Sequence, residues 1–322
     1  MEPLDQLPPI APHECEAAAG VARRIVQNVR TAVQVEDRTL EHVIVALLGE
    51  GHVLMEDYPG VGKTALARAL SRSIDCQFAR VQCTADLLPA DVVGSNIWNQ
   101  REGQFEFRPG PIFANVVLVD EINRASPRTQ SGMLECMQER SVTVDVHTHE
   151  LARPFLVLAT QNPVEYEGTY PLPEAQVDRF MVRVSLGYPD LNHEVAMLGD
   201  HGAGDRVLAL EPVVTAAEVL TAQDTATRVQ ATQPLREYLV RLLAQTRADE
   251  RVELGASPRA GLMLLRAAKA RAMLYGRGHV EPGDVQALAR PVLAHRLVLA
   301  PEAVGVGPAQ VIADAVAAVP AL

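Results

Sequence analysis

The fold of this chain is decided by residues 52–65, which read HVLMEDYPGVGKTA. The stretch opens with a short apolar run, His52 to Met55, and continues into a turn that contains proline and glycine. From Lys63 to Asp75, apolar side chains recur every three or four positions, as on one face of a helix. The order of strand, glycine-rich turn and helix is typical of a loop that cradles phosphate groups.

The glycine-rich turn supplies the groups that a bound triphosphate requires. Gly60 and Gly62 let backbone N–H groups close around phosphate oxygens, and the start of the following helix adds a favourable dipole. Lys63 brings a positive charge to the β- and γ-phosphates, and Thr64 offers its hydroxyl to Mg²⁺. Asp57 stands where the full pattern has glycine, and a tight turn without nucleotide is the structural alternative. The residues expected to contact ATP are Pro59, Gly60, Val61, Gly62, Lys63, Thr64 and Ala65.

Three further apolar runs predict the other strands of a sheet. They lie at 78–81, 116–119 and 155–159, and they do not alternate with polar residues. A continuous apolar run is typical of a strand that is buried on both faces of a parallel sheet. Because helical stretches separate the runs, we expect a three-layer α/β domain that ends at the turn-like residues 187–190.

The remainder of the chain has a different character. Helical patterns occupy 235–248, 258–275, 282–299 and 309–319, with no convincing strand among them. They predict a smaller, separate all-α domain. The expected organisation is a flexible leader at 1–13, an α/β core at 14–189 and the all-α domain at 190–322.

Two adjacent carboxylates, Asp120 and Glu121, directly follow the apolar run at 116–119. A parallel strand would deliver both to the edge of the sheet where ligands bind. We expect Asp120 to hold Mg²⁺, mostly through water, and Glu121 to act as general base on the attacking water. A purely structural pair at a strand end is the alternative.

Three more polar residues are candidates for the same chemistry. Asn162 follows the run at 155–159, where it could orient the water, although it could also cap a turn. Arg179 is expected at the domain edge, where it would serve the γ-phosphate of a neighbouring subunit or pair with Asp178. Arg259 follows a predicted helix start at Ser257, from which it could fold onto nucleotide phosphates or remain solvated.

Composition limits the class of partner. Asp and Glu number 40 against 29 Lys and Arg, a formal charge of −11, which disfavours non-specific binding of nucleic acid. The four cysteines form no CxxC pair, which fits a reducing compartment and neither a disulfide framework nor a zinc site. No apolar run approaches the roughly 20 residues of a membrane span, and the N-terminus is unlike a signal peptide. We expect a cytoplasmic protein.

Taken together, these residues resemble AAA+ ATPases, and most closely the MoxR family. The segments that carry the resemblance are 51–64, 110–113, 120–125, 159–163, 167–180 and 255–259. It implies a P-loop AAA+ core followed by an all-α lid. It assigns the phosphate-loop pair to Lys63 and Thr64, the second acidic motif to Asp120 and Glu121, the first sensor to Asn162, the arginine finger to Arg179 and the second sensor to Arg259.

The resemblance also accounts for less regular parts of the chain. Members of the MoxR family commonly carry aspartate at the position of Asp57. Residues 86–109 resemble the helix-two insertion, and 141–154 the hairpin before the first sensor, with valines alternating at 142, 144 and 146. Residues 34–36 read Gln-Val-Glu where the family usually has Val-Gly-Gln, near the adenine in relatives.

The implied function is that of an ATP- and Mg²⁺-dependent motor that remodels, matures or activates a target complex. Such proteins form rings, often hexamers, and frequently work with a partner bearing a von Willebrand factor A domain. Because the arginine finger acts on a neighbour, a monomer would have an incomplete site. The alternatives are a magnesium-chelatase-like motor subunit, a helicase loader, a transcription activator, an unfoldase, or a nucleotide-gated scaffold with little turnover.

Overall fold

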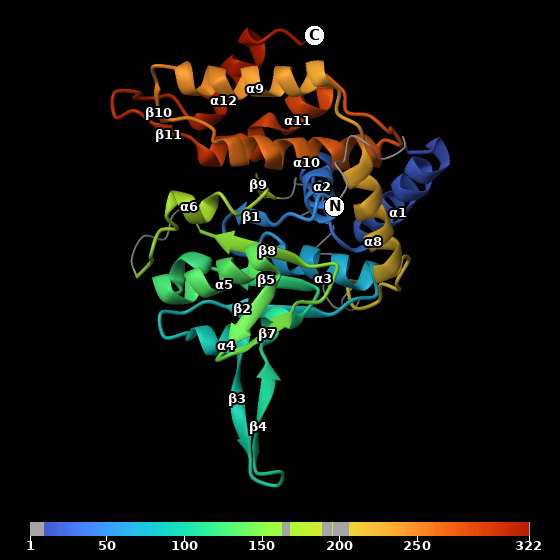
Figure 1. Ribbon diagram of the computed structural model, residues 1–322, viewed down its shortest axis with the longest axis vertical. Coiled ribbons are helices and arrows are strands. Elements are labelled where there is room, and N and C mark those ends of the chain that lie inside the picture. Colours follow the sequence, from blue (N-terminus) through green and yellow to red (C-terminus); the bar gives the residue numbers. More distant parts are fainter. Residues whose placement is uncertain (1–9, 163–167, 189–194, 196–205, 322) are drawn as a thin grey trace.

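The computed structural model describes residues 10–162, 168–188, 195 and 206–321. A central sheet carries helices on both faces, with a helical body at one end and a long β-hairpin projecting from the other (Figure 1). The first helix begins at Pro12 and Ile10 is buried, so ordered structure starts inside the segment predicted as a flexible leader. Residues 1–9 and the predicted boundary at 189–190 lie outside the described part of the chain.

The sheet has five parallel strands in the order β2-β5-β8-β1-β9. Their bounds are Val53–Glu56 (β1), Phe78–Gln82 (β2), Val116–Asp120 (β5), Leu156–Gln161 (β8) and Val182–Val184 (β9). Val117 of β5 lies opposite Ala79 on one side and Val157 on the other. Because all five strands run in the same direction, their carboxyl ends meet at one edge, where ligands bind in such sheets.

Alternate residues of the strands face two different helical layers. Val116 and Leu118 of β5 share a hydrophobic cluster with the first layer, whereas Val117 and Val119 share one with the second. The first layer comprises α1 (Pro12–Ala32), α2 (Asp37–Leu48) and α3 (Lys63–Ser73); the second comprises α4 (Pro89–Val93) and α5 (Pro127–Glu139). The predicted three-layer α/β architecture with a parallel sheet is therefore confirmed.

Two strands differ from the sequence prediction. β2 forms the edge of the sheet, and only its Val81 is buried, so the expected burial on both faces is wrong for this strand. The sequence does not predict β9, because three residues are too few to give a periodic signal. β9 pairs with β1 and completes the sheet on the side of the helical body.

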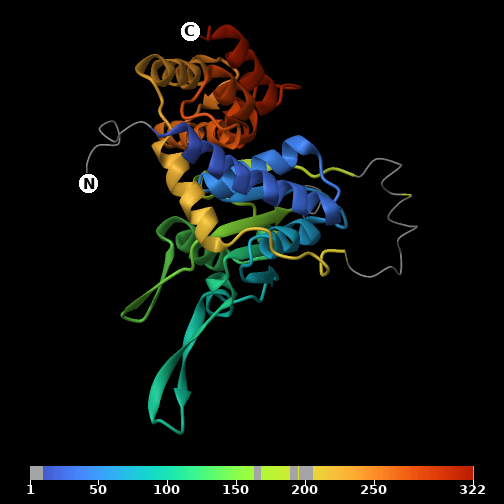
Figure 2. The ribbon, with the colours of Figure 1, turned by 90° about the vertical axis from the view of Figure 1, so that its right-hand side faces the viewer.

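The C-terminal helices form the second body. They are α9 (Gln233–Ala248), α10 (Pro258–Leu274), α11 (Pro282–Leu293) and α12 (Pro308–Ala318), whereas α8 (Ala216–Arg228), which precedes them, lies along the α/β core (Figure 1). Helix α8 runs beside α1 (Figure 2), and its Gln223 Nε2 donates to the Leu47 carbonyl at 2.7 Å. None of the described helices is both long and apolar enough to span a bilayer.

One short antiparallel pair interrupts this helical body. Strands β10 (Val252–Leu254) and β11 (Val298–Leu299) pair with each other, so the helix predicted over 282–299 ends at Leu293. A single 3-10 turn, Ala294–Arg296, connects that helix to β11. The predicted helix start at Ser257 is confirmed, since its Oγ accepts a hydrogen bond from the Ala260 N–H at 3.1 Å.

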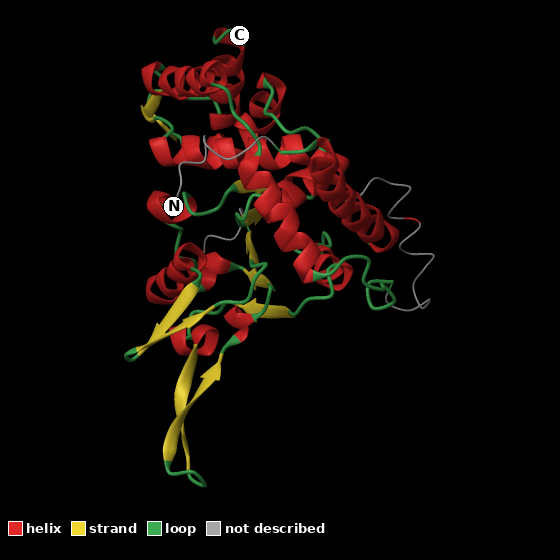
Figure 3. Cartoon of the chain, turned by 45° about the vertical axis from the view of Figure 1, so that its right-hand side comes forward, coloured by secondary structure: helices red, strands yellow, loops and turns green. Residues whose placement is uncertain are grey.

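Two hairpins project from the α/β core on the side away from the helical body (Figure 3). The longer pairs β3 (Gly94–Asn99) with β4 (Gln104–Pro109), and the shorter pairs β6 (Ser141–Val144) with β7 (His147–Glu150). Val146 lies in the turn and is 86% exposed, so it does not continue the predicted strand alternation. The His149 ring stacks on Phe107 at 3.9 Å between centroids, which joins the two hairpins.

Candidate functional site

The glycine-rich turn lies between β1 and α3, at the carboxyl edge of the sheet. Gly60 and Gly62 have φ of 88° and 94°, values that side chains rarely adopt, and no atom lies within 4 Å of a Cβ built on either. The loop therefore has both the backbone shape and the open space that a phosphate group needs. The Lys63 ammonium bridges the loop by donating to the carbonyls of Asp57 at 2.9 Å and Tyr58 at 3.1 Å.

A cavity of about 290 Å³ opens beside this loop. Its walls come from the ends of β2, β5 and β8, which the parallel topology brings to the same edge. The lining residues are Pro59, Gly60, Gly62, Lys63, Thr64, Arg80, Gln82, Asp120, Glu121, Thr160 and Asn162. The structure thus brings together every predicted site residue except Val61, Ala65, Arg179 and Arg259 around one cavity.

Glu121 is held in an unusual backbone conformation at the end of β5. Its φ of 55° is left-handed, which is rare outside glycine and typical of functional sites. The Glu121 N–H donates to Thr160 Oγ1 at 2.8 Å, and the carboxylate accepts from Gln82 Nε2 at 3.0 Å and Arg124 Nη1 at 3.1 Å. These contacts fix the direction in which the carboxylate faces the cavity.

Asp120 is buried at the same strand end and pairs with Arg80 at 2.6 Å. Sequence reasoning did not select Arg80, Gln82 or Thr160. A signal was present, because the polar residues at 80 and 82 alternate along β2 and therefore share one face of the strand. Only the sheet order shows that this face borders Asp120.

The donor set fits a triphosphate with its magnesium ion. The Thr64 hydroxyl and the Asp120 carboxylate line the same cavity, and both are the oxygen ligands that Mg²⁺ prefers. Burial lowers the pKa of Lys63, while the carboxylates of Asp57, Asp120 and Glu121 oppose that shift. The Lys63 ammonium therefore lies in a partly desolvated setting beside three carboxylates.

Asp57 ties the phosphate loop to the chain segment that follows β9. Its side chain is buried and accepts three hydrogen bonds, from Ser185 Oγ at 2.7 Å, the Leu186 N–H at 2.6 Å and the Gly187 N–H at 3.1 Å. Glycine at this position could make none of these bonds. These three bonds are a structural reason for aspartate instead of glycine at position 57, and the motif alone does not reveal it.

A second cavity, of about 820 Å³, lies beside residues 185–187 and between the core and the helical body. Residues 185–187 line one wall, Glu36 and Thr39 at the start of α2 line another, and Arg290 of α11 faces them. It therefore includes the end of the segment 34–36, where the sequence departs from the family pattern. The cavity is large enough for a nucleoside and contains polar groups from both bodies.

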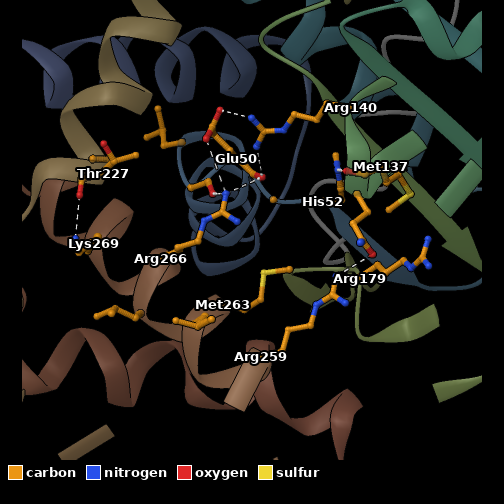
Figure 4. Close-up of a pocket in the computed structure, with 17 residues that line it drawn as sticks. Glu50, His52, Met137, Arg140, Arg179, Thr227, Arg259, Met263, Arg266 and Lys269 are labelled. Carbon is orange, nitrogen blue, oxygen red and sulfur yellow. Dashed lines mark hydrogen bonds and ion pairs between the residues drawn. The ribbon is translucent and has the colours of Figure 1, made fainter. Parts of the chain in front are cut away.

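Arg179 and Arg259 lie elsewhere, in a third cavity of about 580 Å³ (Figure 4). Residues 49–52, which precede β1, line that cavity, whereas the phosphate loop follows β1. The two sites are thus at opposite ends of a strand about 13 Å long. In this structure Arg259 therefore does not line the phosphate cavity of its own chain, and its predicted contact with nucleotide phosphates stays a prediction.

The two arginines differ in how they are paired. Arg259 lies 3.6 Å from the Asp178 carboxylate and donates to Gln138 Oε1 at 3.3 Å. The Nε and Nη1 atoms of Arg179 are buried and have no hydrogen-bond partner among the described residues. Asp178 instead pairs with Arg296 at 2.7 Å, so the alternative of an Arg179–Asp178 salt bridge is not what the structure shows.

Comparison with known proteins defines the class. The family model for the ATPase family associated with various cellular activities (AAA) matches residues 52–182, and the model for the AAA lid domain matches residues 244–315. A crystal structure from Cytophaga hutchinsonii, described as a "putative ATPase", superposes with a TM-score of 0.89 at 36% identity, covering 96% of this chain and 97% of that one. Fold and loop together are those of an AAA+ ATPase.

Sequence relatives narrow the class to a family. The uncharacterized protein YeaC of Bacillus subtilis is 52% identical over 260 residues, 81% of each chain. The chaperone MoxR1 of Mycobacterium tuberculosis is 38% identical over 306 residues, 92% of this chain and 81% of its own. The chain belongs to the MoxR family of AAA+ ATPases.

Proposed function

We propose that this protein hydrolyses ATP with Mg²⁺ as one subunit of a ring, and that it uses the cycle to remodel a partner protein complex. One observation carries the proposal. The phosphate cavity holds Lys63, Glu121 and Asn162, whereas the candidate arginines lie at the opposite edge of the same chain. A second copy of the chain, placed head to tail, would supply the missing arginine.

Within one chain, the residues of the phosphate cavity divide the chemistry. Lys63 neutralises the β- and γ-phosphates, and Glu121 accepts the proton of the attacking water, which Asn162 orients. Thr64 and Asp120 would hold Mg²⁺. When bound, that ion supplies positive charge to the phosphate oxygens.

The contacts of Glu121 suit the role of general base. Gln82 and Arg124 both donate to the same carboxylate oxygen, Oε2, so Oε1 is the oxygen that would accept the proton of the attacking water. The Thr160 hydroxyl accepts the Glu121 N–H and itself donates to Asp120 Oδ1 at 3.2 Å. The two acidic residues and the end of β8 are therefore held as one unit.

Arg179 suits action on a neighbouring subunit. Its buried Nε and Nη1 lack hydrogen-bond partners among the described residues, a costly state that an incoming phosphate would relieve. Arg259 lines the same cavity and would face the same phosphate. A ring of six and a partner with a von Willebrand factor A domain follow from family resemblance, and the name chaperone given to MoxR1 supports a remodelling role.

The proposal is tested by separating nucleotide binding from hydrolysis. Lys63→Ala should abolish binding of a fluorescent ATP analogue. Glu121→Gln should retain binding but lose turnover by at least about 100-fold, because the amide cannot accept a proton. Glu135→Gln, on the exposed face of α5, is the matched control and should turn over normally. Tight ATP binding by Lys63→Ala would reject the site, and full turnover by Glu121→Gln would remove that residue from the role of base.

A nucleotide-gated scaffold gives a different pattern. In that case the unmodified protein would bind ATP with little turnover, and Glu121→Gln would change neither quantity. Measuring both binding and phosphate release on the same preparations therefore distinguishes the two functions.

A further inference from the structure

Arg296 of the helical domain reaches into the segment that carries Arg179. It ends the 3-10 turn that follows α11, and only 3% of its side chain is exposed. The guanidinium lies against residues 178–181, which connect α6 (Glu174–Val177) to β9. This buried arginine carries no motif that the sequence analysis selected.

All three nitrogens of Arg296 bond to that segment. Nε donates to Asp178 Oδ1 at 2.7 Å, and Nη2 donates to the carbonyls of Asp178 at 3.1 Å and Phe180 at 2.6 Å. Nη1 lies 3.4 Å from the Met181 carbonyl and also donates to the Val292 carbonyl in α11. One side chain thus holds the residues on both sides of Arg179 and links them to the end of a helix.

The charge of Arg296 is balanced locally. Burial lowers the pKa of Arg296, and the Asp178 carboxylate opposes that shift. Burial and then the charge of Arg296 lower the pKa of the adjacent His295 well below the usual value. Its Nε2 lies 2.7 Å from Arg296 Nη1 and 3.2 Å from the Phe180 carbonyl, so His295 contacts both the guanidinium and the segment that it holds. A buried ion pair of this kind adds little to stability compared with apolar packing, so its geometric role is the more informative one.

Asp178 connects Arg296 to the other candidate arginine. Its Oδ1 accepts from Arg296, and its Oδ2 lies 3.6 Å from Arg259 Nε in α10. Both arginines therefore come from the helical domain and meet at one carboxylate, directly before Arg179 in the chain. A shift of α10 or α11 relative to the sheet would move Arg179 and Arg259 together.

We infer that Arg296 is a positioning residue that couples the orientation of the helical domain to Arg179, and hence to ATP hydrolysis in the neighbouring subunit. The inference rests on the proposed action of Arg179 on a neighbour. Arg296 does not line the phosphate cavity of its own chain. It fixes the backbone carbonyls on either side of Arg179. Its loss should therefore impair ATP hydrolysis in the neighbouring subunit and spare the nucleotide site of its own chain.

The first test compares Arg296→Met with Arg277→Met. Arg277 is a matched control, because it shares the buried Asp284 with Arg271 just as Arg296 shares Asp178 with Arg259, but its bonds stay within the helical domain. Arg296→Met should keep ATP affinity within about twofold and lose about 100-fold in kcat, the cost of misplacing a catalytic group by roughly 1 Å. Arg277→Met should keep both. Equal losses in the two variants, or unchanged kcat in Arg296→Met, would overturn the inference.

The second test determines whether Arg296→Met impairs hydrolysis in its own subunit or in the neighbouring one. In a random equal mixture of Arg296→Met and Lys63→Ala subunits, about one interface in four pairs an intact phosphate loop with an intact Arg296. Activity should therefore rise well above that of either parent. If Arg296→Met does not fold, Asp178→Asn, which keeps the side-chain size, takes its place in both tests and carries the same expectation.

A parallel mixture separates the inference from the function on which it rests. Arg179→Ala mixed with Lys63→Ala should also recover. Recovery with Arg179→Ala but not with Arg296→Met would overturn the role of Arg296 alone. Recovery in neither mixture would overturn the action of Arg179 on a neighbour, and the role of Arg296 with it.

Discussion

Acidification should destabilise this protein through one buried histidine, His52. The ring lies directly before β1 and accepts the Val157 N–H at Nδ1, 3.1 Å away, while Nε2 lies 3.1 Å from the Met137 carbonyl. Only the neutral ring with its proton on Nε2 satisfies both contacts. A second proton, on Nδ1, would face the Val157 N–H in a fully buried setting.

The size of this loss of stability follows from the difference in the pKa of His52 between the folded and unfolded chain. Burial lowers the pKa of His52 from 6.5 to about 4. The unfolded chain therefore takes up a proton near pH 6.5 while the folded protein does not, so stability is complete above that pH and falls as the pH decreases toward 4. Between pH 7 and pH 5 the free energy of unfolding should decrease by about 2 kcal/mol from this group alone.

Urea unfolding at pH 7, 6 and 5 measures this decrease, with His52→Gln as the comparison. His42 and His295 also have lowered pKa values, but the unmodified protein and His52→Gln both retain these two histidines. The difference between the two pH profiles therefore isolates the contribution of His52. The variant should be less stable at pH 7 and should lose less stability at pH 5. Parallel profiles would refute the reasoning.

Two further variants test the phosphate loop and the long hairpin. Asp57→Gly restores the usual motif but removes the three hydrogen bonds to residues 185–187. ATP affinity, measured by fluorescence titration, should therefore fall about tenfold. Unchanged affinity would show that these bonds do not support the phosphate loop. Gly94→Ala adds a Cβ only 2.2 Å from the Arg108 carbonyl at a φ of 91°, so limited proteolysis of residues 94–109 should accelerate while ATP binding is kept, and an unchanged digestion pattern would count against the close approach.

The local features of the phosphate site could be predicted from the sequence. The loop from Pro59 to Thr64 and the pair Asp120–Glu121 each carry their context with them, a strand before and a turn or helix after. Their meeting around one cavity follows from the parallel sheet, because strand ends on one edge are neighbours wherever they lie in the chain. Asn162 lies at the same cavity for the same reason, because it directly follows β8.

Features that depend on the packing of two bodies could not be predicted in this way. The cavity that Arg259 lines could not be predicted, because a helix start gives a direction only relative to its own helix, and the position of α10 is set by its packing on α1, α2, α8 and α11. Arg296 has no motif, because its role depends on the carbonyls of Phe180 and Met181, which any sequence would present. Asp57 looked like a departure from a pattern until its partners were visible.

If each active site is shared by two subunits, two variants that are defective in different parts of it should restore each other's activity when mixed. Arg179→Ala and Lys63→Ala proteins, each inactive alone, are mixed in equal amounts and their ATPase activity is measured. We expect recovery to about a quarter of the unmodified activity, the fraction of interfaces that combine an intact phosphate loop with an intact Arg179. A control mixture of Lys63→Ala with Glu121→Gln should stay inactive, because every subunit then lacks either the lysine of its phosphate loop or its general base. If the first mixture also stays inactive, Arg179 does not act on a neighbour.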